Sequence, residues 1–250
     1  MPILKTVALS KSFLLAGKPR LILSDVNFQM EAERFVCVVG SSGCGKSTWL
    51  ELLAGITVPD SGEIFFQGNL ITGSSGNLGY MPQDDLLFPW LNVVENALLP
   101  VRVKKGDLAA ARARIHQLLP VFGLERHAGH LPYQLSGGLR QRAAFLRTVM
   151  LDAQLLLLDE PFAGLDAITR LQLQDWLGII TREMKLSIIF VTHDIDEAIN
   201  LADEIWVMQG PPGGFGETYF LRASDREEPT RSSLKKEILS QVEAGLAPVN

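Results

Sequence analysis

Short, continuous apolar segments alternate along the chain with longer segments of helical periodicity. The apolar segments are residues 35–39, 154–159, 187–192 and 204–208. Runs of this kind are typical of parallel strands that are buried on both faces of a sheet. Helical patterns over about 167–184 and 195–202 separate the later segments. Alternating strands and helices predict a doubly wound α/β sheet, with its site at the carboxyl ends of the strands.

The first 90 residues contain further strand patterns with more polar positions. The predicted strands are residues 3–9, 21–29, 63–66 and 77–81. A turn around Gly17-Lys18-Pro19 joins the first two strands, and Pro59-Asp60-Ser61-Gly62 forms a turn before the third. No internal repeat or low-complexity tract interrupts this pattern.

Residues 91–153 carry no strand pattern, which predicts a helical insertion into the α/β core. Asp107 is a good N-cap for a helix with its apolar residues on one face, and Pro120 should end or bend that helix. A second helix is predicted from about residue 139 to 150, after Gly137-Gly138.

The chain ends in a predicted short strand at 218–220 and a charged amphipathic helix at about 232–242. We therefore interpret residues 1–250 as one domain with three parts. These parts are a core with a β subdomain (1–90 and 154–210), a helical subdomain (91–153) and a C-terminal extension (211–250).

Composition narrows the functional classes. At 250 residues and 47% hydrophobic, the chain can bury the core of one domain, or of a domain plus a subdomain. The net charge of −5 disfavours a nucleic-acid partner, which would call for a basic excess. No apolar stretch reaches the roughly 18–20 residues of a membrane helix, and lysines interrupt the first 20 residues. We expect a cytoplasmic chain without a signal peptide.

The chain has two cysteines, Cys37 and Cys44, whose spacing indicates neither a disulfide framework nor a metal site. Cys44 lies beside cationic groups and a predicted helix N-terminus, which lower a thiol pKa. We therefore expect a reactive Cys44 whose alkylation abolishes nucleotide binding.

A glycine-rich segment follows the apolar run 35–39 and precedes a predicted helix that begins near Lys46. Strand, loop and helix in this order are the context that a phosphate-binding P-loop requires. Its glycines let backbone N–H groups converge on an anion, and the helix N-terminus adds positive potential. Lys46 can reach the β- and γ-phosphates, and the Ser47 hydroxyl can bind Mg²⁺. The predicted phosphate-binding residues are Gly40, Ser41, Ser42, Gly43, Cys44, Gly45, Lys46, Ser47 and Thr48.

The apolar run 154–159 ends in Asp159, and a second acidic residue, Glu160, follows directly. In a P-loop ATPase, Asp159 would hold Mg²⁺ opposite Ser47, usually through water. Glu160 would orient or deprotonate the water that attacks the γ-phosphate. The alternative for both is an ordinary solvated charge at the end of a strand.

The segment Leu135-Ser136-Gly137-Gly138-Leu139-Arg140-Gln141-Arg142 resembles the signature of ATP-binding cassette (ABC) ATPases. Further motifs follow that family's order, namely Pro82-Gln83, Asp159-Glu160-Pro161, Gly164-Leu165-Asp166 and Thr192-His193-Asp194. The resemblance covers about residues 3–210. It implies an α/β P-loop NTPase (RecA-like) core with an N-terminal antiparallel β subdomain and an inserted helical subdomain.

The resemblance also implies roles and partners. Two copies would meet head to tail, with each ATP between one P-loop and the Ser136-Gly137-Gly138 signature of the other copy. Gln83 would touch Mg²⁺ or the attacking water, and His193 would contact the γ-phosphate. Asp166 would communicate across the dimer, and Phe13 would stack on adenine; the alternative for Phe13 is a core position. The chain departs from the family pattern at two places. Glu33-Arg34 stands before the P-loop strand where the family usually has Gly-Glu, and Leu139 stands in the signature where glutamine or methionine is commoner.

Residues 84–96 resemble the corresponding segment of importers of the nitrate/sulfonate/taurine group. A related group of importers takes up vitamin precursors. The resemblance implies two permease subunits, a solute-binding protein outside, and a place on the inner face of the cell membrane. An exposed Trp90 would suit docking on a short permease helix, and burial of Trp90 is the alternative.

Other P-loop proteins fit the sequence less well. A soluble ABC ATPase that is not linked to transport typically pairs two cassettes or inserts a long coiled coil. A P-loop kinase needs no signature, and an exporter cassette is often fused to membrane helices.

Overall fold

The core of the molecule is a six-stranded sheet. In this computed structural model, residues 1–15, 17–73 and 78–245 are described. The strand order is β10-β9-β3-β8-β7-β6. The strands are β3 (Phe35–Val39), β6 (Gly79–Met81), β7 (Leu155–Asp159), β8 (Ser187–Thr192), β9 (Glu204–Gln209) and β10 (Gly214–Phe220). All neighbours pair in parallel except β10, which runs antiparallel to β9. The carboxyl ends of β3, β7 and β8 therefore meet at one edge.

Each face of this sheet belongs to a separate hydrophobic cluster, because successive side chains of a strand point to opposite faces. Val36 and Val38 pack with the second sheet and helix α1 (Lys46–Leu53), whereas Cys37 and Val39 pack with the other helices. Both faces are thus covered, as the uninterrupted apolar runs predict.

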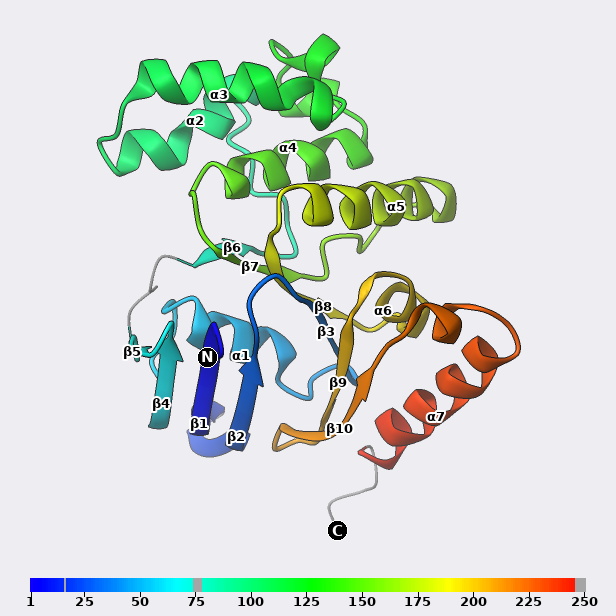
Figure 1. The fold of residues 1–250 in the computed structure, drawn as a ribbon. Coiled ribbons are helices and arrows are strands. Elements are labelled where there is room, and N and C mark those ends of the chain that lie inside the picture. The colour runs from blue at the N-terminus through cyan, green and yellow to red at the C-terminus, as the bar shows by residue number, and fades with distance from the viewer. Residues whose placement is uncertain (16, 74–77, 246–250) are drawn as a thin grey trace.

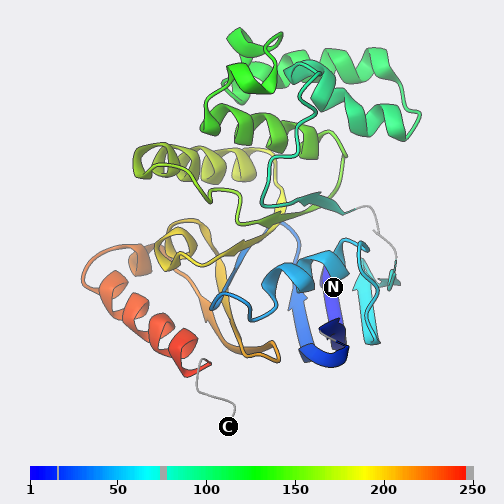
Figure 2. The same ribbon diagram turned by 180° about the vertical axis from the view of Figure 1, so that it is seen from behind.

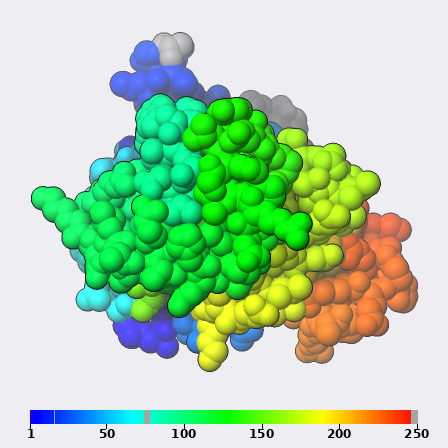
Figure 3. Space-filling model, turned by 90° about the horizontal axis from the view of Figure 1, so that it is seen from above, coloured from blue at the N-terminus to red at the C-terminus, as the bar shows by residue number. Residues whose placement is uncertain are grey.

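The second sheet is antiparallel, in the order β2-β1-β4-β5. Its strands are β1 (Leu4–Leu15), β2 (Lys18–Met30), β4 (Ser61–Phe66) and β5 (Asn69–Leu70). The hairpin of β1 and β2 is longer than the predicted strands 3–9 and 21–29. It carries register irregularities that disturb the alternation of apolar and polar residues. Viewed from above, the blue hairpin projects beyond the green helices (Figure 3).

The helices α2 (Val93–Val103), α3 (Leu108–Val121), α4 (Gly137–Val149) and α5 (Ala167–Glu183) form a layer above the core sheet (Figure 1). Helix α2 was not predicted individually, and it contains Pro100, a residue that normally argues against a helix interior. The cap Asn92 and the apolar packing of α2 outweigh that penalty. Asp107 caps α3 as predicted, and Pro120 lies one residue before its end.

Helix α6 (Ile195–Leu201) lies between β8 and β9, and a short 3-10 helix (Ala223–Arg226) and α7 (Thr230–Ala244) follow β10. Both opposite views place α7 at the outer side of the core, away from the helical layer (Figures 1 and 2). Ile238 of α7 is fully buried against the core. The predicted helix 232–242 is therefore real but longer. Asn77 of a predicted strand and residues 246–250 of the extension lie outside the described residues.

Candidate functional site

The glycine-rich loop between β3 and α1 is shaped by contacts that only glycine permits. A Cβ at Gly40 would lie 2.4 Å from the backbone oxygen of Met208. Gly45 is the N-cap of α1 with φ of 109°, in the left-handed region that favours glycine. The loop backbone is thereby drawn tightly around the N-terminus of α1, where N–H groups can bind an anion.

Lys46 is held inside this loop. Its side chain donates from Nζ to the carbonyl oxygens of Gly40 at 2.8 Å and Ser41 at 2.9 Å. The residue is only 5% exposed. A nearly buried ammonium thus lies at the centre of the loop, where it can meet a phosphate oxygen.

Asp159 faces Ser47 across the ends of β7 and α1. The Ser47 hydroxyl donates to Asp159 Oδ1 at 3.1 Å, and the Tyr80 hydroxyl donates to Oδ2 at 3.5 Å. Burial raises the pKa of Asp159, and the nearby Glu160 adds to the rise, against the lowering by the Ser47 hydrogen bond. Tyr80 was not predicted as a site residue, although its place in β6, three residues before Gln83, could have indicated it.

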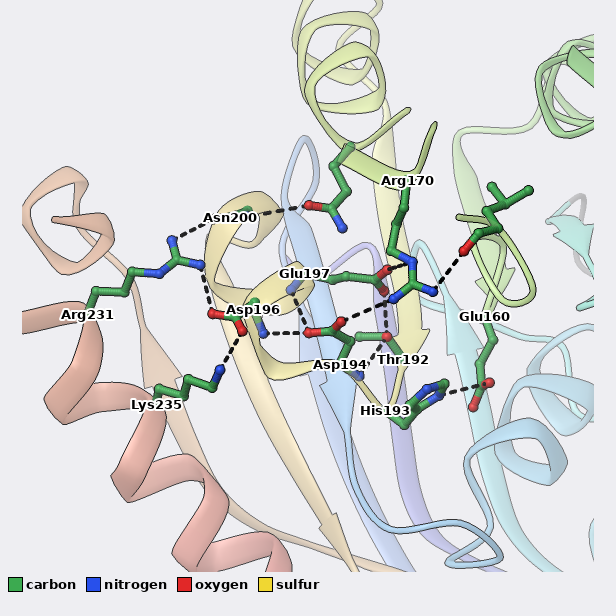
Figure 4. Close-up of polar contacts among 12 residues, drawn as sticks. Glu160, Arg170, Thr192, His193, Asp194, Asp196, Glu197, Asn200, Arg231 and Lys235 are labelled. Carbon is green, nitrogen blue, oxygen red and sulfur yellow. Dashed lines mark hydrogen bonds and ion pairs between the residues drawn. The ribbon is translucent and has the colours of Figure 1, made fainter. Parts of the chain in front are cut away.

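Glu160 and His193 form the second polar contact of this edge. His193 Nδ1 lies 3.1 Å from Glu160 Oε2 (Figure 4). The two residues meet because β7 and β8 are hydrogen-bonded neighbours whose pairing ends at Asp159 and Val191. The His193 side chain is 60% exposed and that of Glu160 is 21% exposed. Both can therefore be reached by a ligand.

A cavity of about 550 Å³ is lined by residues from several distant segments of the chain. Gln83 and Phe13 line it together with Lys46, Ser47 and Glu160. Phe13 is 37% exposed at the hairpin, so the alternative of a core position is wrong. The complete lining is Phe13, Leu15, Ile22, Ser42, Gly43, Gly45, Lys46, Ser47, Thr48, Gln83 and Glu160. Leu15 and Ile22 were not predicted, because nothing local marks them.

The signature residues lie elsewhere. Ser136, Gly137 and Gly138 begin α4, and they are not among the described residues that line this cavity. Ser136 caps α4 by accepting a hydrogen bond from Leu139 N at 3.3 Å. The two glycines let α4 approach the start of α5. A Cβ at Gly138, for example, would lie 2.8 Å from Thr169 Cγ2.

Asp166 also lies outside this cavity and is the N-cap of α5. Its carboxylate accepts hydrogen bonds from Thr169 N at 3.0 Å and from the Thr169 hydroxyl at 2.7 Å. One copy of the chain therefore brings the P-loop, Asp159, Glu160, His193, Gln83 and Phe13 to one edge, but not the signature or Asp166.

Several known proteins are similar to this chain in sequence and in fold. The family model described as ABC transporter matches residues 23–163. This chain belongs to the ABC transporter family. The taurine import ATP-binding protein TauB of Pseudomonas aeruginosa is 40% identical over 82% of this chain and 78% of its own. The aliphatic sulfonates import ATP-binding protein SsuB of Bacillus cereus is 38% identical over 94% of both chains.

Another relative is the formylaminopyrimidine import ATP-binding protein ThiZ of Halalkalibacterium halodurans, 37% identical over 87% of this chain and 88% of its own. A solved structure is also similar. It is the ATP-binding cassette MJ0796, as a dimer in a post-hydrolysis state bound to ADP and phosphate. Its TM-score is 0.77 at 28% identity, over 88% of this chain and 99% of that chain. The predicted ABC transporter ATPase family and the ABC ATPase fold are confirmed.

The prediction that its neighbours lower the pKa of the Cys44 thiol was wrong for this ABC transporter family member. Cys44 is fully buried, and burial raises its thiol pKa despite the opposing effect of Lys46. Gly213, from the turn between β9 and β10, packs so closely that a Cβ there would lie 2.1 Å from the Cys44 carbonyl oxygen. A segment about 170 residues away therefore packs against the Cys44 backbone, which sequence neighbours could not reveal.

The residues after Gln83 form an exposed apolar surface. Leu86 is 60%, Phe88 41% and Trp90 70% exposed, and the rings of Phe88 and Trp90 lie 5.2 Å apart between centroids. The alternative that Trp90 is buried is therefore wrong. Arg147 of α4 anchors this surface, because its guanidinium donates to the carbonyl oxygens of Leu86 at 2.6 Å and Asp85 at 2.7 Å.

Within residues 1–15, 17–73 and 78–245, no helix is both long and apolar enough to cross a membrane. The same described residues contain no cluster of three His, Cys, Asp or Glu side chains that could hold a metal ion.

Proposed function

We propose that this chain is the ATP-hydrolysing subunit of an importer, and that its solute is small, resembling a sulfonate, taurine, nitrate or a vitamin precursor. The observation that carries the proposal is the convergence of Lys46, Ser47, Asp159, Glu160 and His193 at one sheet edge. The names of TauB, SsuB and ThiZ, all import ATP-binding proteins, favour import over a soluble ABC ATPase.

The side chains suggest a division of roles around ATP. The loop from Gly40 to Thr48 would bind the triphosphate through backbone N–H groups and the Lys46 ammonium. Glu160, accessible and beside His193, would accept a proton from the attacking water. His193 would hold the γ-phosphate, and Phe13 would provide an aromatic face for adenine.

The donor set fits Mg²⁺. The Ser47 hydroxyl and the Asp159 carboxylate already face each other at 3.1 Å, and Gln83 lines the same cavity. These are the hard oxygen ligands that Mg²⁺ prefers. When bound, Mg²⁺ would neutralise charge on the β- and γ-phosphates. Ser47, Asp159 and Gln83 are therefore its proposed protein ligands, directly or through water.

A second copy of the chain would complete the site. Ser136, Gly137 and Gly138 present a helix N-terminus that a single copy does not turn into its own P-loop cavity. In a head-to-tail homodimer this N-terminus would bind the γ-phosphate of the ATP on the opposing copy. Hydrolysis would remove that link, so that ATP binding closes the pair and hydrolysis opens it.

The exposed surface of Leu86, Phe88 and Trp90 is the proposed contact with the permease. An aromatic pair on an anchored segment suits the apolar face of a short permease helix. Two permease subunits would hold the homodimer at the cytoplasmic face of the cell membrane, and a solute-binding protein would deliver the solute from outside. Nucleic acid is no part of this proposal.

Gene replacement tests the function. The gene would be deleted in its source organism, and growth would be measured with taurine or aliphatic sulfonates as sulfur source, nitrate as nitrogen source, or a pyrimidine vitamin precursor. We expect loss of growth on one of these, rescue by the wild-type gene and by the exposed-lysine control Lys236→Ala, and no rescue by Lys46→Ala. Normal growth and uptake on every solute would contradict the import proposal.

A further inference from the structure

The guanidinium of Arg170, in the first turn of α5, contacts two separate turns of the chain (Figure 4). Arg170 Nη2 donates to the carbonyl oxygen of Leu165 at 3.1 Å. On the other side, Nη1 lies 3.5 Å from Asp194 Oδ2 and Nε lies 3.8 Å from Glu197 Oε1. A single side chain thereby holds both turns at once.

The first turn, residues 163–166, is named here the aspartate turn because it ends at Asp166. Leu165 N donates to Phe162 O at 3.4 Å, and Ala163 N donates to Glu160 O at 3.0 Å. The aspartate turn is therefore connected directly to the backbone of the proposed base, Glu160. Arg170 grips it one residue before Asp166.

The second turn, residues 192–194, is named here the switch turn because His193 lies at its middle. Asp194 N donates to the Thr192 hydroxyl at 3.0 Å, and that hydroxyl donates to Glu197 Oε2 at 2.6 Å. Asp194 Oδ1 also caps α6 by accepting from Asp196 N at 2.9 Å. The carboxylates that Arg170 contacts are thus the same groups that fix the backbone on both sides of His193.

Burial makes this contact more than a surface ion pair. The Glu197 side chain is 6% exposed, and Arg170 Nε is buried without a hydrogen bond to any described residue, so that its contact with Glu197 is an ion pair. A buried carboxylate depends on its cation and hydrogen bonds, because water cannot replace them. The His193 side chain, in contrast, is 60% exposed, and its only hydrogen bond among the described residues is to Glu160. Its position is therefore set mainly by the backbone of the switch turn.

We propose that Arg170 is a positioning residue that locks the aspartate turn to the switch turn and so keeps His193 in register with Glu160. This inference rests on the proposed ATPase function. A guanidinium suits the task because its planar fork offers several donors in different directions, whereas a lysine ammonium is a point charge on a flexible stem. Arg170 itself touches neither Glu160 nor the described lining of the nucleotide cavity.

The test measures single-turnover hydrolysis of radiolabelled ATP by the full chain with Mg²⁺. Arg170→Ala and Arg170→Lys are compared with Arg182→Ala, an exposed arginine of the same helix. We expect both Arg170 variants to hydrolyse about 10- to 100-fold more slowly, since small misplacements of catalytic groups cost this much. The Kd for ATP should change less than about twofold. Arg182→Ala should match the wild type.

A double-mutant cycle separates positioning from general damage. In a His193→Ala background, replacing Arg170 by Ala or Lys should change the rate by less than about twofold, because the residue through which it acts is absent. The same loss in both backgrounds would overturn the proposal. Wild-type turnover of the Arg170→Lys protein would also overturn it. Arg170→Lys is the variant to use if Arg170→Ala does not fold.

Failure of the inference and failure of the function give different results. A wild-type chain that hydrolyses ATP while Arg170→Lys and Arg170→Ala match it contradicts only the positioning role. A wild-type chain without Mg²⁺-dependent hydrolysis contradicts the proposed function before any variant is made.

Discussion

Replacing Glu160 by glutamine should separate ATP binding from ATP hydrolysis. Glutamine has the same shape and can keep the 3.1 Å contact with His193 Nδ1, but it cannot accept the proton of the attacking water. Loss of a general base costs about 10²- to 10⁴-fold in rate. At about 1.4 kcal/mol per tenfold, this corresponds to about 3–5 kcal/mol of transition-state stabilisation.

Binding should not suffer, for an electrostatic reason. Glu160 lines the cavity with Lys46 and Ser47, and its charge contributes to the raised pKa of Asp159, after burial. Glu160→Gln removes one negative charge from a cavity that must accept a triphosphate. The Kd for ATP should therefore stay the same or fall, and the ATP-bound homodimer should accumulate.

Three measurements on one preparation check this prediction. Phosphate release gives turnover, titration with a fluorescent ATP analogue gives the Kd, and size-exclusion chromatography with light scattering gives the dimer fraction. Glu183→Gln, at an exposed glutamate of α5, is the matched control. Turnover of Glu160→Gln within about threefold of the wild type would refute the assignment of the base. Loss of ATP binding in that variant would refute the electrostatic argument.

Three shorter predictions follow from burial and charge. Trp90→Ala should leave the ATPase rate and the stability of the isolated chain nearly unchanged, because Trp90 is 70% exposed. The same variant should abolish solute uptake, and normal uptake would rule out the docking surface. Burial alone would raise the pKa of Asp196, but hydrogen bonds from Lys235 and Arg231 outweigh burial and lower that pKa. The Asp196 carboxylate therefore stabilises the folded chain above about pH 4, and this stabilisation is lost at lower pH. Asp196→Asn should thus lower the thermal midpoint at pH 7 by a few degrees at most, and the difference should vanish in acid; an equal difference at pH 7 and pH 2.5 would contradict this. Cys37 and Cys44 are buried with raised thiol pKa values, so iodoacetamide at pH 7.5 should label them only in denaturant, as mass spectrometry would show; rapid labelling of folded chain would disprove their burial.

Elements with strong local signals were predictable. The β3 and β7 runs are apolar at nearly every position because both sheet faces are covered. Caps such as Asp107 act on the N–H groups two and three residues ahead, so their effect is visible in sequence. Helix α2 was not predicted individually, because Pro100 reads as a breaker, whereas the packing that overrules it comes from α3 and α4.

The sequence alone predicted a phosphate loop, an acidic pair at a strand end and an ABC signature, because these motifs are runs of neighbouring residues. Their mutual placement was decided by the tertiary structure. Phe13 and Gln83 share a cavity with the loop, and His193 reaches Glu160, only because strand pairing and a long hairpin carry them there. The burial of Cys44 and the link from Arg170 to both turns depend on segments that are distant in the chain. Solvent exclusion and charge pairing are properties of that packing, so the pKa of a thiol or the partner of an arginine cannot be read from its neighbours.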